Sequence, residues 1–203
     1  MVAPNSDGTV CYTIDKFAMP TLHLVLGTGN KIVTDLQEKV PAVNEFFKKL
    51  CIVKESYQGK TFEGNELQNF LDHLEELRAY VPEEFVDYIE ALEALRILKK
   101  SCFGFTLDPD WYKSIRNFEL KWIVLKVKFK VSVINKCHII FTHVEQQILR
   151  TGRALGEFSE QAVEACHQKF KVIWEWYKVK DVECEEHGKQ FYKSVNHFNA
   201  FNI

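Results

Sequence analysis

Apolar residues that recur every three or four positions constrain this chain more than any other feature. One run follows Asn65 and continues on Leu67, Phe70, Leu71, Leu74 and Leu77. A second run covers about residues 83–102, between Pro82 and Gly104. This spacing places an apolar stripe on each of two helices, and each helix must bury its stripe against other elements.

The same spacing predicts helices along most of the chain, at residues 20–36, 41–50, 136–150, 159–177 and 183–198. Five prolines and nine glycines leave few breaks for a turn-rich β protein. Hydrophobic residues make up 46% of the chain, which is enough for a sizeable core. We therefore predict an all-α, multi-helix bundle, with a flexible N-terminus at 1–16 and a single helical domain at 17–203.

The segment that begins at Trp111 fits two periods. Its first part has a helical spacing on Tyr112, Ile115, Phe118 and Trp122. From Leu125 to Val133, apolar residues alternate with lysines in the first half, which is a strand's period of two. We expect a helix as far as Lys130, with a short extended segment near 125–133 as the alternative.

Cysteine usage and polarity bear on the location of the protein. The six cysteines are irregularly spaced and form no C-x-x-C pair, and the first residues lack the charged and apolar regions of a signal peptide. The longest low-charge run, residues 17–34, is too polar to span a membrane. We therefore expect buried, reduced thiols and an intracellular location, nuclear or cytoplasmic, with no membrane partner. The oligomeric state stays open.

Charge is distributed unevenly although the net charge is only −2. Residues 55–95 carry eleven acidic against two basic residues, a net −9, and residues 96–153 carry twelve basic against four acidic residues, a net +8. One explanation is that the two segments pack side by side and neutralise each other. The other is that the basic segment faces phosphates. The charges alone favour the first explanation.

Two carboxylates and an imidazole share one face of the helix expected after Ser159. At about 100° per residue, Glu160, Glu164 and His167 line up opposite a core face that includes Phe170, Ile173 and Trp174. They could hold a divalent ion or exchange protons. Spacing alone favours an ordinary solvated helix face.

Cysteines and histidines raise the question of zinc. Neighbouring Cys137 and His138 would point about 100° apart on a helix, and His138 and His143 about 140° apart. Neither pair would converge on one ion, so we predict no metal site. The sequence contains no phosphate-binding loop, nucleophile elbow or zinc-protease motif. Catalysis by a cysteine–histidine pair stays open, because nothing singles out one pair.

Several motifs resemble those of a transposase family. They are MPTLHLVLG at 19–27, KCHIIFTHV at 136–144, RTGRALG at 150–156 and FSEQAVEACH at 158–167. They are similar to the C-terminal region of animal transposon-encoded transposases that have an RNase H-like catalytic core with three carboxylates. In that group, a K-x-H-I-x-x-x-H-V helix leads through a T-G-R-x-L-G loop into an S-E-Q-x-x-E-x-x-H helix. The resemblance covers most of residues 17–180.

The resemblance implies roles for two sets of residues. Glu160 is the first candidate for the third catalytic carboxylate and Glu164 the second, in a site where two Mg²⁺ ions activate the attack on a phosphodiester. The basic segment would face DNA, through Lys126, Lys128, Lys130, Lys136, Arg150 and Arg153.

The sequence also departs from the family pattern. Only Asp7 and Asp15 precede the matched region, so the two core aspartates have no counterpart, and Ile134-Asn135 stands where the family commonly has Thr-Pro. We therefore expect no catalysis by this chain alone and no cofactor, with Mg²⁺ entering only if the missing catalytic half is supplied. The expected function is that of a transposase-derived remnant that binds DNA or a partner protein. The alternative is an unrelated helical protein–protein interaction domain, and an enzyme of an unrecognised type is third.

Overall fold

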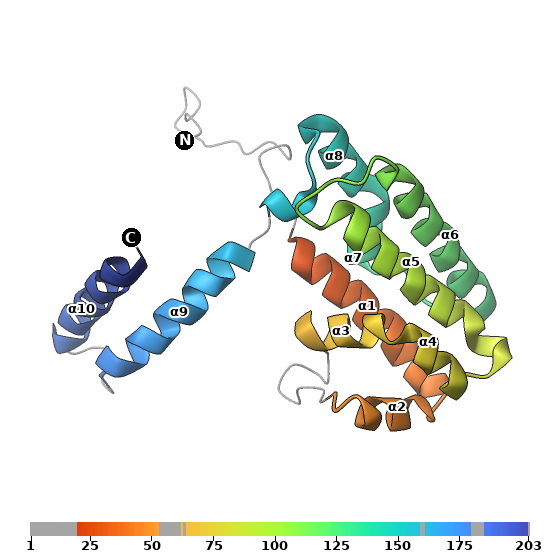
Figure 1. The fold of residues 1–203 in the computed structure, drawn as a ribbon, viewed down its shortest axis with the longest axis horizontal. Coiled ribbons are helices and arrows are strands. Elements are labelled where there is room, and N and C mark those ends of the chain that lie inside the picture. The colour runs from red at the N-terminus through yellow and green to blue at the C-terminus, as the bar shows by residue number, and fades with distance from the viewer. Residues whose placement is uncertain (1–19, 53–61, 63, 159–160, 180–184, 203) are drawn as a thin grey trace. The chain divides into compact units, whose positions relative to one another are not determined.

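The computed structural model describes residues 20–52, 62, 64–158, 161–179 and 185–202 (Figure 1). Every regular element in these ranges is a helix, which confirms the predicted all-α fold. The chain divides into two compact units, Met1–Ser159 and Glu160–Ile203, which are considered separately below. The predicted flexible segment at 1–16 lies outside the described residues, and the single domain over 17–203 stays a prediction.

Three long helices form the body of the first unit. They are α1 (Thr21–Lys39), α5 (Val86–Cys102) and α6 (Trp111–Phe129). Helix α5 packs against both α1 and α6 (Figure 1). It buries side chains on two sides, among them Tyr88, Ile89, Ala91, Leu92, Ala94, Leu95 and Leu98. The apolar stripe predicted over residues 83–102 is therefore at the centre of this unit.

Short helices pack along one side of α1 and α5. They are α2 (Val43–Lys49), α3 (Gly64–Asp72) and α4 (Leu74–Leu77), followed by 3₁₀ turns at Arg78–Tyr80 and Glu83–Phe85. The helix predicted after Asn65 thus starts at Gly64 and is interrupted at His73. An aromatic cluster lies beneath these helices and consists of Phe46, Phe47, Phe62 and Phe70.

A buried amide ties this region to α1. The Asn30 Oδ1 accepts a hydrogen bond of 2.8 Å from the Phe62 N–H, and its Nδ2 donates one of 3.5 Å to the Phe62 carbonyl oxygen. Because both ends of the amide are satisfied, Asn30 can be buried in an apolar environment without the penalty of an unpaired polar group.

The helical interpretation of the segment after Trp111 is confirmed as far as Phe129. Lys130 ends the helix with φ of 62°, in the left-handed region. Residues 130–134 then form no helix and pair in no strand. The alternation of apolar residues and lysines at 125–129 is therefore not that of a strand. Leu125 and Val127 belong to one helix, in which Leu125 is buried on the inner face and Val127 is exposed on the outer face.

The KCHIIFTHV motif lies in one continuous helical segment whose middle is a π-helix. The segment consists of α7 (Asn135–His138), a π-helix (Ile139–Val144) and α8 (Glu145–Thr151). A π-helix closes its hydrogen bonds over five residues instead of four, so its turn is wider. The prediction of a helix at 136–150 is confirmed in extent, but not in its internal geometry.

Two glycines of the RTGRALG loop have separate structural roles. Gly152 ends α8 with φ of 65°, and its N–H donates a 2.8 Å hydrogen bond to the Ile148 carbonyl oxygen. Gly156 belongs to a 3₁₀ turn, Leu155–Phe158, and its N–H donates a 3.0 Å hydrogen bond to the Gly104 carbonyl oxygen. A Cβ at Gly156 would overlap that carbonyl group. The loop is therefore fixed to the chain that leaves α5.

The second unit is a pair of helices, α9 (Gln161–Tyr177) and α10 (Glu185–Asn202). The Phe170 ring packs against those of Phe191 and Phe198, and the Trp174 ring packs against that of Phe191. Phe170 and Trp174 are half-buried, as is Ile173. The predicted face of this helix thus faces α10, which confirms the helical phase.

Candidate functional site

The carboxylates suggested by the resemblance are not placed by the structure. Glu160 lies outside the described residues. Glu164 and His167 belong to α9, but their side chains also lie outside the described part of the molecule. Their vestigial catalytic role stays a prediction.

The six basic residues come from several elements. Lys126 and Lys128 are exposed on α6, Lys130 is exposed at its end, and Arg150 is exposed on α8. Because residues two apart on an α-helix point about 200° apart, Lys126 and Lys128 project to opposite sides of α6. Lys136, at the start of α7, lies across α1, where a Cβ at Gly27 would overlap its side chain. A DNA-binding role for this set stays a prediction.

Some of the basic charge is neutralised within the protein. The Lys128 ammonium lies 2.6 Å from a carboxylate oxygen of Asp87, and the Lys121 ammonium lies 2.6 Å from one of Glu90. Both pairs connect α6 to α5, the last helix of the acidic segment. Arg153 pairs with Glu157 at 3.5 Å. The structure therefore supports the first explanation of the charge pattern along the α5–α6 contact.

An apolar stripe covers the outer face of α6. Leu120, Ile123, Val124 and Val127 are 62%, 48%, 38% and 65% exposed. Their spacing of three, four and seven residues puts them on one side of the helix. The buried residues of α6 lie on the opposite side and include Ile115, Phe118, Trp122 and Leu125. Sequence analysis missed this stripe, although its spacing is visible in residues 120–127.

The π-helix brings two histidines together. The ring centroids of His138 and His143 lie 5.3 Å apart with their planes at 88°. The predicted separation of about 140° is therefore wrong, because it assumed an α-helical turn between them. The Nδ1 atom of His143 lies 3.2 Å from Gln146 Oε1, and that of His138 lies 3.4 Å from Thr142 Oγ1. Within the described part of the chain, no three His, Cys, Asp or Glu side chains are grouped so that they could hold a metal ion.

Buried thiols are part of the interior and not of a reactive site. Burial raises the pKa of the Cys102 thiol to about 12 and that of Cys137 to about 11. Both are free cysteines, as predicted. Since the thiolate is the nucleophilic form, neither thiol is activated at neutral pH. Cys51 is also free but is exposed, contrary to the prediction that the cysteines are buried.

Comparisons with known proteins add no identification: no family model, curated protein or solved structure matches this chain. No helix among the described residues is long and apolar enough to cross a membrane.

Proposed function

We propose that this chain is a transposase-derived helical domain whose remaining role is to bind a protein partner through α6. The transposase origin rests on the resemblance of residues 17–180. The binding role rests on the outer stripe of α6, defined as Leu120, Ile123, Val124 and Val127. Four aligned, exposed aliphatic side chains form a continuous apolar surface of the kind that marks an interaction site.

The proposed partner is an amphipathic helix whose apolar stripe is bordered by acidic residues. An exposed helix face with this spacing is suited to the apolar face of another helix. Lysines border the stripe on both sides, with Lys121 and Lys128 on one side and Lys126 on the other. Lys126 forms no ion pair with any described residue. Aspartate or glutamate at the edges of the partner would therefore complement this border.

Duplex DNA is the alternative ligand, and the ion pairs argue against it. Lys128 and Lys121 already contact carboxylates of α5, which would lie close to any phosphate bound there. DNA binding would also leave the apolar stripe without a role. Protein binding explains both the stripe and its charged border.

Fluorescence anisotropy with labelled probes tests the proposal. The first probe is a synthetic amphipathic peptide with leucines at the stripe's spacing and glutamates at its edges, and the second carries lysines in place of the glutamates. We expect the acidic peptide to bind at least about tenfold more tightly than the basic one. The double variant Leu120→Ser/Val127→Ser should lose most of that binding, because it removes the two most exposed side chains of the stripe.

The matched control is Ile97→Ser, which removes an exposed aliphatic side chain from α5. It should bind the acidic peptide like the unchanged protein. Equal losses in the control and the double variant would contradict the proposal. So would duplex DNA binding whose affinity falls steeply with salt and is unchanged in the double variant. Self-association that the double variant abolishes would instead assign the stripe to a second copy of the chain.

A further inference from the structure

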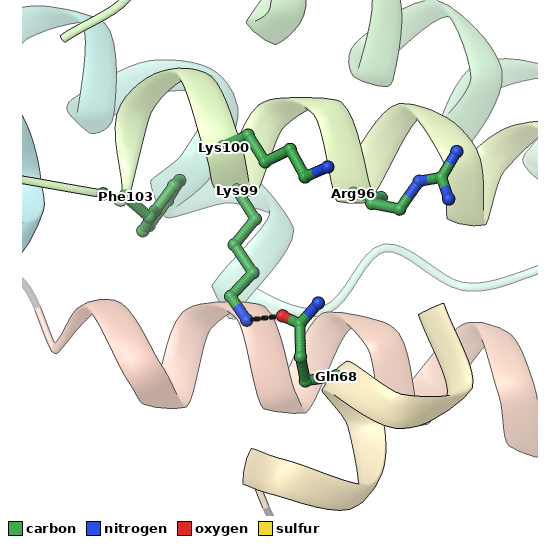
Figure 2. Close-up of a pocket in the computed structure, with 6 residues that line it drawn as sticks. Gln68, Arg96, Lys99, Lys100 and Phe103 are labelled. Carbon is green, nitrogen blue, oxygen red and sulfur yellow. Dashed lines mark hydrogen bonds between the residues drawn. The ribbon is translucent and has the colours of Figure 1, made fainter. Parts of the chain in front are cut away.

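A small pocket lies where the C-terminal end of α5 meets α3. It has a volume of about 210 Å³ and is lined by Gln68, Arg96, Lys99, Lys100, Phe103 and Gly104. Figure 2 shows the Lys99 side chain extending from α5 to Gln68, with Phe103 just past the end of α5. This pocket is separate from the stripe on α6, and no sequence motif pointed to it.

The pocket contains cationic side chains without anionic partners. No carboxylate among the described residues forms an ion pair with Arg96, Lys99 or Lys100. Lys121 and Lys128 of α6 differ in this respect, since both contact carboxylates. The acid that acts on Lys99 is Asp72, whose carboxylate oxygens accept hydrogen bonds of 2.8 Å from the Gln68 Nε2 amide. Three cationic side chains therefore line one pocket, with Lys99 directed toward Gln68 and with Arg96 and Lys100 extending along α5 (Figure 2). The Arg96 guanidinium also donates a 3.4 Å hydrogen bond to the Leu71 carbonyl oxygen.

Placing the Lys99 ammonium group in this pocket costs desolvation free energy. Its ammonium group donates a hydrogen bond to the uncharged Gln68 Oε1. Burial lowers the pKa of Lys99, although Asp72 acts in the opposite direction. Cations in the last turn of a helix do stabilise its dipole, but an exposed lysine would do so without being desolvated. Stability alone does not explain why this lysine turns inward.

We propose that this pocket binds the phosphate group of a small organic phosphate monoester. A guanidinium and two ammonium groups recognise a dianionic phosphate through charge-assisted hydrogen bonds. The Phe103 ring supplies an apolar wall for an attached organic group. The volume is below that of sites for drug-sized molecules but several times the space of a single water. The ligand is therefore a compact phosphate ester.

Titration of the full chain with phenyl phosphate, followed by isothermal calorimetry or amide chemical shifts, tests this proposal. We expect saturable binding with a Kd on the order of 0.1–1 mM. Inorganic phosphate should bind more weakly because it does not contact Phe103, and benzyl alcohol should not bind. Lys99→Gln and Arg96→Gln should each weaken phenyl phosphate binding about tenfold or more.

Lys169→Gln is the matched control, because it removes the same charge from an exposed site on α9, outside the pocket. Its affinity for phenyl phosphate should be unchanged. Thermal unfolding without ligand gives a second readout, since Lys99→Gln removes a desolvated charge and should keep or raise the Tm. The absence of saturable binding below about 10 mM, or equal losses in Lys169→Gln and Lys99→Gln, would overturn the proposal. Equal affinities for inorganic phosphate and phenyl phosphate would show that the pocket does not recognise the organic group of the ester.

Discussion

Helices α5 and α6 lie side by side and are similarly rich in aliphatic residues, yet they use them differently. Helix α5 packs against α1, α3, α4 and α6, so most of its apolar residues are buried. Helix α6 packs against α5 and the π-helix, and its other side keeps Leu120 and Val127 exposed. The number of neighbours, and not the composition of a helix, decides how much apolar surface remains for a partner. Three substitutions test this contrast.

The largest effect is expected on the inner face of α6. Trp122 is 1% exposed and packs against Phe118 and Phe141. Trp122→Ala should lower the free energy of unfolding by about 3–5 kcal/mol, because it leaves a cavity between α6 and the π-helix. Chemical denaturation measures this loss. Leu120→Ser, on the same helix, should change it by less than about 0.5 kcal/mol, and comparable losses at both positions would contradict the assignment of the two faces.

A smaller, pH-dependent effect is expected where α5 contacts α1. The buried Tyr88 hydroxyl donates a hydrogen bond to Asp35, and Lys39 lies 2.6 Å from the same carboxylate. Burial alone would raise the pKa of Asp35, but the hydrogen bonds from Lys39 and Tyr88 outweigh it and lower that pKa. Tyr88→Phe should therefore reduce stability by about 1–2 kcal/mol at neutral pH.

The sign of the pH dependence follows from the direction of the shift. A carboxylate with a lowered pKa stabilises the folded state above its unfolded pKa of about 3.9. That contribution disappears as the pH falls through the lower folded pKa. The difference between Tyr88→Phe and the unchanged protein should thus shrink in acid, as measured by urea unfolding from pH 7 to about pH 2. A difference that grows in acid would show that Tyr88 does not stabilise the charged form of Asp35.

The smallest effect is expected at the ion pair between the two helices. Lys128→Gln removes the contact with Asp87 and should lower stability by about 0.5 kcal/mol, since such partly exposed pairs contribute little. Lys126→Gln removes the same charge without breaking an ion pair and should have no effect on stability. Thermal unfolding of both variants in low and high salt separates them, because only the first loss should diminish with salt. Equal stability of the two variants would show that the pair does not tie α6 to α5.

Periodicity predicted the helices better than it predicted their surfaces. The helix after Trp111 and the end of the α5 helix before Gly104 were predictable from spacing, proline and glycine. The period of two near Leu125 was misleading because α6 has apolar residues on both faces. A helix with two apolar faces interleaves inward and outward positions, and single-sequence spacing does not distinguish that pattern from a strand.

The candidate sites depend on contacts that spacing does not encode. Arg96, Lys99 and Lys100 resemble an ordinary basic helix end in the sequence, and only the position of α3 turns them into a pocket. The stripe on α6 was visible as spacing, but its exposure depends on which side α5 covers. The break at His73 was not predictable either, because the leucines on both sides continue the same period.

The π-helix has a consequence for how related sequences would be aligned. Its wider turn accommodates one residue more than an α-helical turn would, within Ile139–Val144. A relative with an uninterrupted α-helix in this place would reach the same position of α8 with one residue fewer. If the missing residue lay between the two histidines, they would be four residues apart instead of five, and a gapless alignment would shift every position beyond Val144. A search for relatives should therefore permit a one-residue gap inside this motif.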